Sequence, residues 1–374
     1  MSLKYKDNKL TPMESVKRTK SNYKAIMTSL KRAICISTLQ MDWKACIEHF
    51  KMKNSSIVSS IVLEAFYRME DLKYLYFVTF LVLYMLLLFA NAIVIFVIII
   101  NKVLHNPMNY FLCNLAVNGI YGGTALLPPL LGTLMSPSHE VSLACCKAQI
   151  YFLHTYAIIE FTILSVMCYD RYVAICYPLQ YHSIMTITKV YKLIAFSWGY
   201  PLVIFAVFFI MTLRLTICQN RLGRVYCLNF YLVKMSCGNT YIESIMGLLF
   251  LVVYSFPQLA MTFYSYGHIL KICFTATKES KIKALKTCTP HLFAILNYSV
   301  GCFFEIVQSR FDTSYLSFET QMFMSLYFLI FPPILNPAIY GMSVKTLRAN
   351  IFKLVCSKKI KKVIVFKVGS LEHK

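Results

Sequence analysis

Apolar residues are grouped along the chain into seven long runs that alternate with short polar segments. Runs of about 18 residues with few charges have the length that a helix needs to cross the hydrocarbon core of a membrane. In a bilayer the backbone must satisfy its own hydrogen bonds, so helices are predicted, and the alternation typical of membrane β-strands is not seen. The predicted spans are Tyr74–Ile100, Met108–Leu131, Ala148–Val173, Leu193–Leu213, Ser244–Gly267, Leu292–Val307 and Thr320–Val344.

Charged residues break this pattern in the third and sixth spans. Glu160 stands inside the third span, and Asp170 and Arg171 follow each other at its end. Glu305 lies near the outer end of the sixth span. Ionisable groups inside a membrane are unfavourable unless they are paired or functional, so Glu160, Asp170 and Arg171 are candidate site residues. At the end of a span, snorkelling of the charges to the membrane surface also explains Asp170 and Arg171 without any function.

Basic residues gather in alternate connecting loops, which sets the predicted orientation, because short loops rich in Lys and Arg stay cytoplasmic. These loops hold Lys102, Lys189, Lys192, Lys271, Lys278, Lys281, Lys283, Lys286, Lys345, Arg348 and Lys353, whereas the opposite loops carry Glu140, Glu243, Asp312 and Glu319. The predicted fold class is an all-α membrane protein. It is a bundle of seven transmembrane helices with the N-terminus outside and a short amphipathic helix after the seventh span.

Composition agrees with a membrane protein, since 58% of the residues are hydrophobic and 14% are charged. Soluble domains average about 45–50% and about 25%. The net charge of +22 could suggest a nucleic-acid-binding protein. Much of the excess lies in the cytoplasmic loops and tail, where it sets the topology and meets anionic lipid. We therefore expect the lipid bilayer as a partner and no nucleic acid.

The N-terminal region does not fit this arrangement. Residues 1–51 carry eleven Lys or Arg against four Asp or Glu, and they lack an apolar core long enough for a signal peptide. Asn54 begins a glycosylation acceptor sequence of the kind found on an outer tail. We expect the working protein to begin near Met52, and a genuine disordered basic tail is the alternative. The predicted regions are 1–51 as a basic extension, 52–73 as an extracellular tail, 74–344 as the helix bundle and 345–374 as a cytoplasmic helix and basic tail.

Cysteines outside the membrane are expected to pair, because that compartment is oxidising. A bridge from Cys146 to Cys227 would pin the loop between the fourth and fifth spans over the bundle, and Cys218 with Cys237 would close a smaller loop. The sequence alone does not fix this connectivity. Cys356, after an amphipathic stretch beyond the seventh span, is a candidate for lipidation, with a plain thiol as the alternative.

Short motifs stand at the ends of several spans. The segments are LHNPMNYFLCNL at 104–115, MCYDRYVAICYPLQY at 167–181, Ser265-Tyr266, KALKTCTPHL at 283–292 and PPILNPAIYG at 332–341. The triplet Asp170–Tyr172 and the pattern from Asn336 to Tyr340 resemble rhodopsin-class G-protein-coupled receptors, and the five segments together resemble odorant receptors. The wording CNLAVNGIYG and the SRF at 309–311 are closest to the fish-type branch. The resemblance covers about Met52 to Ser357.

This resemblance implies a receptor of the plasma membrane of olfactory sensory neurons that binds a small-molecule odorant and activates a heterotrimeric G protein of the olfactory stimulatory type, raising cyclic AMP. Asp170 is expected to hold Arg171 in the resting state by a charge-assisted bond and to release it towards the G protein on activation. The residues assigned to coupling and activation are Asp170, Arg171, Tyr172, Tyr266, Lys283, His291, Asn336, Pro337 and Tyr340.

Two departures from the receptor pattern concern the middle of the bundle. Gly119 stands where many relatives have an acid on the second helix, which puts the usual internal sodium site in doubt. Glu160 is expected to hold an ion or a proton together with Asn118 and Asn336, and a protonated acid bonded to a neighbour is the alternative. The odorant pocket is expected in the outer half of the bundle, with His154, Ala157, Ile158, Tyr254, Cys302, Phe303 and Ile306 as its predicted lining.

Competing functions find less support. An enzyme requires a nucleophile with a base or a metal cluster, and neither pattern is present, so no cofactor and no metal are expected. A transporter would be expected to show inverted repeats, which the chain lacks. The main alternative is a non-olfactory rhodopsin-class receptor for a peptide or a lipid. Such a receptor shares the motifs of the third and seventh helices, but its second and sixth helices differ in sequence from those of odorant receptors.

Overall fold

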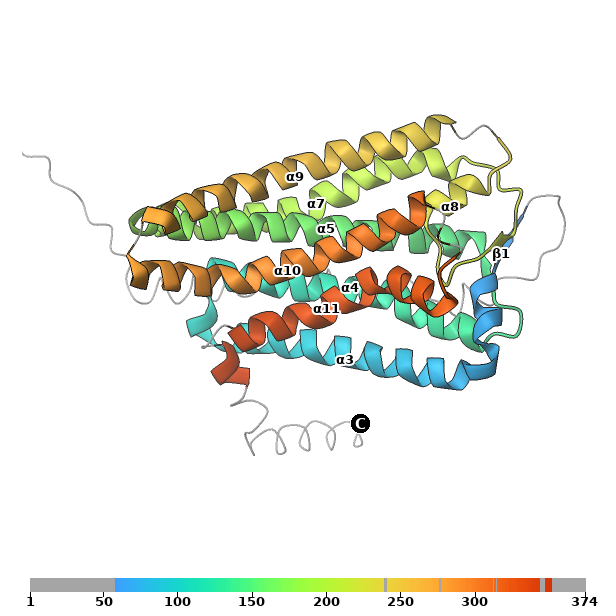
Figure 1. The fold of residues 1–374 in the computed structure, drawn as a ribbon, viewed down its shortest axis with the longest axis horizontal. Helices are drawn as coiled ribbons and strands as arrows, with labels where there is room; N and C mark the ends of the chain where they lie inside the picture. The colour runs from blue at the N-terminus through green and yellow to red at the C-terminus, as the bar shows by residue number, and fades with distance from the viewer. Residues whose placement is uncertain are drawn as a thin grey trace, which may run out of the picture. The chain divides into compact units, whose positions relative to one another are not determined.

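Seven long helices form the structure, a computed structural model that describes residues 58–238, 241–275, 277–311, 313, 315–343 and 347–351 (Figure 1). These residues all belong to one compact unit, Trp43–Lys374. The long helices are α3 (Lys73–Ile100), α4 (Pro107–Met135), α5 (Leu143–Cys176), α7 (Ile187–Leu213), α9 (Tyr241–Thr275), α10 (Lys278–Arg310) and α11 (Phe318–Ser343).

Short elements join or cap these helices. They are β1 (Ser60–Leu63), η1 (Glu64–Leu72), η2 (Lys102–Leu104), β2 (Glu140–Ser142), η3 (Pro178–Gln180), α6 (Tyr181–Ile184), β3 (Arg221–Leu222) and α8 (Asn229–Lys234). Side chains that cap the first turns of helices accept hydrogen bonds from backbone N–H groups that would otherwise be unpaired. Asn106 caps α4 and is followed by Pro107 at the first helical position, and Ser142 caps α5.

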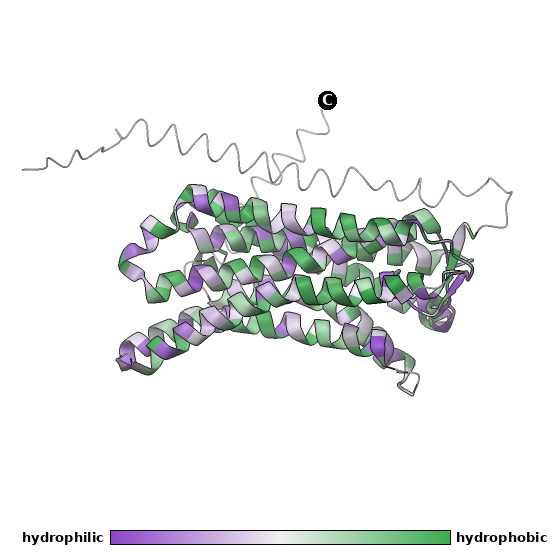
Figure 2. Ribbon diagram, turned by 90° about the horizontal axis from the view of Figure 1, so that it is seen from above, coloured by the Kyte–Doolittle hydropathy of each residue, from purple (hydrophilic) through white to green (hydrophobic). Residues whose placement is uncertain are grey.

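Six of the described helices are long and apolar enough to cross a membrane by length and composition. The remaining long helix, α4, carries Asn109, Asn114 and Asn118, and it packs between α3 and α5. Figure 2 shows hydrophobic residues along the helices and more hydrophilic ones towards their ends. All seven predicted spans therefore fall on helices of the bundle, and the seven-helix fold class is confirmed.

Helix α5 forms the centre of the bundle, because it packs against α4, α7, α9 and α10. In its most apolar window 72% of the residues are buried, compared with 11% in α9. A helix that leaves so many large apolar side chains exposed has a surface suited to lipid. The polar interior consequently lies around α5, where Glu160, Asp170 and Thr162 are buried.

A three-stranded sheet in the order β2-β1-β3 lies at the outer end of the helices (Figure 1). Strand β1 pairs antiparallel with β2, with Ile61 opposite Val141, and parallel with β3, with Val62 opposite Arg221. Strand β1 is thus hydrogen-bonded to two outer loops, the loop between α4 and α5 and the loop between α7 and α9.

Candidate functional site

The charged pair at the cytoplasmic end of α5 is buried and closed on itself. Arg171 donates to the Asp170 carboxylate from both Nε and Nη2, with the Nε–Oδ2 distance at 3.1 Å. The other carboxylate oxygen accepts from the Tyr181 hydroxyl at 2.7 Å. Burial, and next the negative charge of Asp170, raise the pKa of the Tyr181 phenol, so it stays a donor at neutral pH. Both carboxylate oxygens of Asp170 are therefore engaged, and the described hydrogen bonds of Arg171 all go to Asp170.

Tyr172 takes no part in this pair and faces a different side of α5. Its hydroxyl donates to the Tyr177 hydroxyl at 3.4 Å, and its ring packs edge-on against Tyr264 and His268 of α9. Tyr172 thus joins the cytoplasmic half of α9 to α5 by aromatic packing.

A second polar contact joins α9, α10 and α5 one layer deeper. The Nε2 atom of His291 lies 3.1 Å from the carbonyl oxygen of Leu164, and Nδ1 lies 2.6 Å from the Tyr266 hydroxyl. Because a carbonyl only accepts, Nε2 carries the proton and Nδ1 accepts from Tyr266. This arrangement ties α10 to α5, so an outward movement of α10 requires the bond to Leu164 to break. The side chain of Lys283 lies outside the described residues.

Glu160 lies between two asparagines near the middle of the bundle. Its two carboxylate oxygens accept from Asn118 of α4 and Asn336 of α11, both at 2.7 Å. Glu160 and both amides are almost completely buried. The amide oxygens of Asn118 and Asn336 have no partner among the described residues. These two oxygens with the carboxylate form a set of acceptors that suits a cation or a proton.

Helix α11 approaches its neighbours through its prolines and asparagine. The carbonyl of Pro333 accepts from Asn91 of α3 at 2.9 Å, which satisfies a group near the helix-breaking prolines. Pro337 follows Asn336 inside the helix, and the Tyr340 hydroxyl is buried without a partner in the described part of the chain. Tyr340 therefore holds an unused hydrogen-bonding group close to the cytoplasmic end of the bundle.

The surroundings of Gly119 explain why α4 carries no acid at this position. A Cβ at this position would lie 3.2 Å from both Asn91 Oδ1 and Pro333 Cβ. A carboxylate side chain has no room there, because α3 and α11 close over the glycine. The acid that faces Asn336 instead comes from α5 as Glu160.

The outer half of the bundle contains a group of polar and aromatic side chains around Tyr254. The Tyr254 hydroxyl donates to the Ile158 carbonyl at 2.7 Å and lies 3.0 Å from Gln258 Oε1. Ala157 accepts from Tyr298 of α10 at 3.0 Å. The structure thus brings Ala157, Ile158 and Tyr254 together between α5, α9 and α10.

Two predicted lining residues lie elsewhere. His154 stacks on Phe205 of α7 with ring centroids 4.9 Å apart, and its Nδ1 donates to the Ile150 carbonyl at 2.8 Å. Phe303 is 62% exposed on the surface of the bundle. Cys302, its neighbour, is half-buried with a free thiol. The side chain of Ile306 lies outside the described residues.

Four residues around Tyr254 were not expected from the sequence. Phe161 stacks on Tyr298 at 5.4 Å, and Gln258 donates to Thr162 at 3.3 Å. Each lies one helical turn from a predicted member: Phe161 from Ala157, Thr162 from Ile158, Gln258 from Tyr254 and Tyr298 from Cys302. Extending the predicted positions by three or four residues would have found them.

Disulfides fix the outer loop as a cap over these helices. Cys146 is bonded to Cys227, with Cα atoms 5.4 Å apart, and Cys218 to Cys237, with Cα atoms 5.1 Å apart. Cys145 is also disulfide-bonded. Arg224 of the same loop donates to Gln308 of α10 and Ser325 of α11. Among the residues that the structure describes, no cluster of three or more metal-binding side chains occurs. Asn54 and Cys356 lie outside the described residues.

Comparison with known proteins gives one consistent result. The family model for olfactory receptors matches residues 80–358. Human olfactory receptor 13A1 is 32% identical over 305 residues, which is 81% of this chain and 92% of that protein. Human olfactory receptor 51I2 is 33% identical over 278 residues (73% and 88%), and mouse olfactory receptor 4B13 is 29% identical over 291 residues (77% and 93%). The crystal structure of squid rhodopsin matches with a TM-score of 0.62 at 16% identity, covering 80% of this chain and 91% of that one, which shows the fold.

Proposed function

The chain belongs to the olfactory receptor family, and from this premise we propose that it binds a small odorant in the outer half of the bundle and activates the olfactory stimulatory G protein, raising cyclic AMP. The family is a class of receptors in the membrane, so the chain is not an enzyme. We further propose the plasma membrane of olfactory sensory neurons as its location. Membership of the fish-type branch rests on the wording CNLAVNGIYG and Ser309–Phe311 alone, since the relatives named above are human and mouse proteins.

The group around Tyr254 supports odorant binding. It combines apolar surface from Phe161 and Ile158 with hydrogen-bonding groups on Tyr254, Gln258 and Thr162, as small-molecule sites usually do. Because it joins α5 to α9 and α10, a ligand that binds there acts on the helices that carry Tyr266 and His291. Lining by His154 and Phe303 is not part of this proposal, because the one faces α7 and the other the bundle surface.

The buried Asp170–Arg171 pair supports the proposed coupling mechanism. In the resting state Arg171 is held by Asp170, and Asp170 is held by Tyr181. Outward movement of α10 breaks the His291–Leu164 bond and opens space beside Arg171, which then turns towards the G protein. Tyr266 and Tyr340, which is buried with an unused hydroxyl, are the groups placed to receive it.

We propose that Glu160 holds a proton or a cation between α4, α5 and α11 in the resting state. The two unpaired amide oxygens beside its carboxylate support this role. Glycosylation at Asn54, lipidation at Cys356 and a start of the working protein near Met52 remain proposals from the sequence. Peptide mapping of surface protein for residues 1–51 tests the last of these.

Cyclic AMP measured in cells that express the chain with the olfactory G protein tests the function. The full chain and residues 52–374 are exposed in parallel to a panel of small odorants. Arg171→Ala should reach the surface and lose most of the response, whereas Arg214→Ala, which removes an exposed outer arginine, should keep it. A normal response of Arg171→Ala at equal surface level would refute the mechanism, and expression mainly in other organs would favour a receptor for a peptide or lipid.

A further inference from the structure

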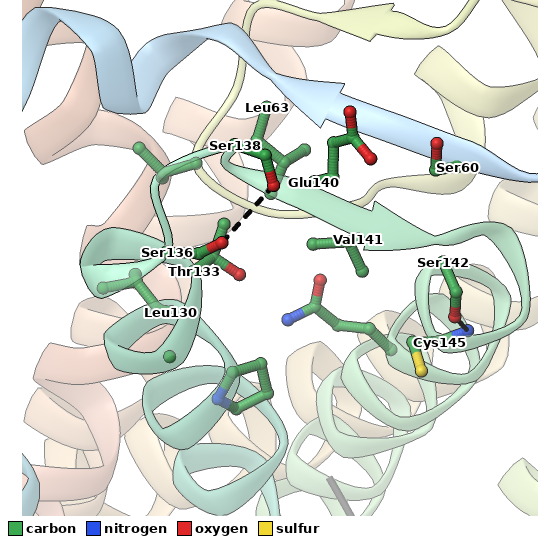
Figure 3. Close-up of a pocket in the computed structure, with 14 residues that line it drawn as sticks. Ser60, Leu63, Leu130, Thr133, Ser136, Ser138, Glu140, Val141, Ser142 and Cys145 are labelled. Atoms are coloured by element: carbon green, nitrogen blue, oxygen red, sulfur yellow. Dashed lines mark hydrogen bonds between the residues drawn. The ribbon is translucent and has the colours of Figure 1, made fainter. Parts of the chain in front are cut away.

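A cavity of about 210 Å³ lies at the outer end of the bundle (Figure 3). Its walls come from the outer end of α4, from strand β2 and from the first turns of α5. Ser60 and Leu63 of β1 and Val225 of the outer loop complete it. None of its described lining residues belongs to α9, α10 or α11, so it is distinct from the proposed odorant pocket.

The lining combines a mainly apolar surface with many hydroxyl groups. Pro129, Leu130, Leu63, Val141 and Val225 supply the apolar part, and Ser60, Thr133, Ser136, Ser138 and Ser142 supply the hydroxyls. Glu140 is the one charged residue among the lining residues described, and no lysine, arginine or histidine is among them. The cavity therefore carries a net negative charge.

Several of these polar groups have hydrogen-bonding capacity to spare. In the described part of the chain, Glu140 forms no ion pair, and the hydroxyls of Ser60 and Thr133 make no hydrogen bond. By contrast, Ser142 accepts from the N–H of Cys145 at 3.2 Å. Gln149 is also engaged, since its Oε1 accepts from the Cys227 N–H at 3.0 Å. The unused groups are thus one carboxylate and two hydroxyls among the residues that line the cavity (Figure 3).

The walls of the cavity are held in place by contacts outside it. His139 has a left-handed backbone with φ of 49°, and its buried ring lies 2.9 Å from the Thr133 carbonyl and 3.0 Å from Glu70 Oε1. This fixes the turn between α4 and β2. The disulfide from Cys146 to Cys227 fixes α5 against the outer loop. A site with rigid walls loses little conformational entropy when a ligand binds.

We propose that this cavity is a second ligand site, which binds a small organic ammonium ion that carries hydroxyl groups. Glu140 supplies the charge complement, Ser60 and Thr133 bond the ligand hydroxyls, and Leu130 and Val141 cover its methylene groups. The volume is below the range of about 300–1,000 Å³ that holds drug-sized ligands, so the ligand is small. A bound ion bridges β1 and β2 to the outer ends of α4 and α5.

Diethanolamine and diethylene glycol are a matched pair of probes, because an ammonium group in the first replaces an ether oxygen in the second. Binding of each to the purified full-length receptor in nanodiscs is measured by saturation-transfer NMR at low ionic strength. The variants are Glu140→Gln and Thr133→Val, with Asp71→Asn as the control that removes another exposed outer acid. Tyr254→Phe reports on the odorant pocket.

Diethanolamine should bind more tightly than diethylene glycol, and Glu140→Gln should weaken only diethanolamine, by about two- to fivefold, since Glu140 is exposed. High salt should reduce this difference. Thr133→Val should weaken both probes, and Asp71→Asn should change neither. Equal binding of diethanolamine to the wild type and Glu140→Gln overturns the proposal, as does equal loss in Asp71→Asn. Loss in Tyr254→Phe alone places the probe in the odorant pocket and overturns it as well.

Discussion

The close contact of α4 and α5 at Gly122 makes a strong prediction about stability. A Cβ at this position would lie within 2.8 Å of three ring carbons of Tyr156. The Tyr156 ring is fully buried and packs on Phe328 of α11, with ring centroids 5.8 Å apart. Contacts this short require a shift, and because the ring is buried, we expect Gly122→Ala to push the two helices apart.

Two opposing terms determine the size of the effect. Overpacking of a dense interior destabilises by about 1–3 kcal/mol. Alanine in a helix gains about 1 kcal/mol over glycine. Because the clash involves a ring fixed on both sides, we expect a value near the upper end, and Gly122→Ala should destabilise by about 1–2 kcal/mol net. Gly199 of α7 is the matched control, since an added Cβ meets nothing within 4 Å.

The assay measures the melting temperature of the purified receptor in detergent. Unfolding is detected by the increasing reactivity of buried cysteines. Gly122→Ala should melt a few degrees lower than the wild type, and Gly199→Ala should melt at the same temperature or slightly higher. In a Tyr156→Ala background the effect of Gly122→Ala should disappear, because the clashing ring is gone. If Gly122→Ala melts like Gly199→Ala, the inferred packing of α4 on α5 is wrong.

Two further predictions concern the polar interior and the outer cap. Glu160→Gln should change the melting temperature little, because the new Oε1 still accepts from Asn118, and the amide of Asn336 can turn so that its unpaired oxygen accepts from the new Nε2. Glu160→Leu should lose about 1–3 kcal/mol for each group left unpaired. Equal melting of the two variants contradicts this. Cys146→Ser should lower surface staining in flow cytometry, because it frees the outer loop held at Cys227. Cys176→Ser, which removes a free thiol, should leave the staining unchanged. Unchanged staining of Cys146→Ser argues against a need for the disulfide-bonded outer loop.

The seven spans could be predicted from the sequence because a membrane-spanning helix must be apolar, and hydropathy measures how apolar a segment is. The ends of the helices could not. Helix α10 begins at Lys278 rather than Leu292, and α9 continues to Thr275 rather than ending at Gly267. Once a helix has started, each further turn avoids the cost of nucleation. Polar turns rich in lysine can therefore extend a span into water without any hydropathy signal.

Part of the candidate site followed from chemistry alone. Glu160 needed a partner because an isolated acid in a membrane is unfavourable, and Asn118 and Asn336 were the expected groups. Tyr181, which bonds Asp170, carries no such signal. The positions of His154 and Phe303 depend on how α5 and α10 are rotated about their axes, and the apolar residues around these helices are too evenly spread to reveal that rotation.

The parallel pairing of β1 with β3 has a consequence for biosynthesis. During translation β1 leaves the ribosome before the seven helices of the bundle, but its partner strand β3 follows α3, α4, α5 and α7. The β1–β3 edge of the sheet therefore remains unpaired until these helices have entered the endoplasmic reticulum membrane. Chaperones that bind exposed strand edges would have their longest access to the receptor in this interval, so the rate of insertion of α7 would decide how long the nascent chain is exposed to quality control.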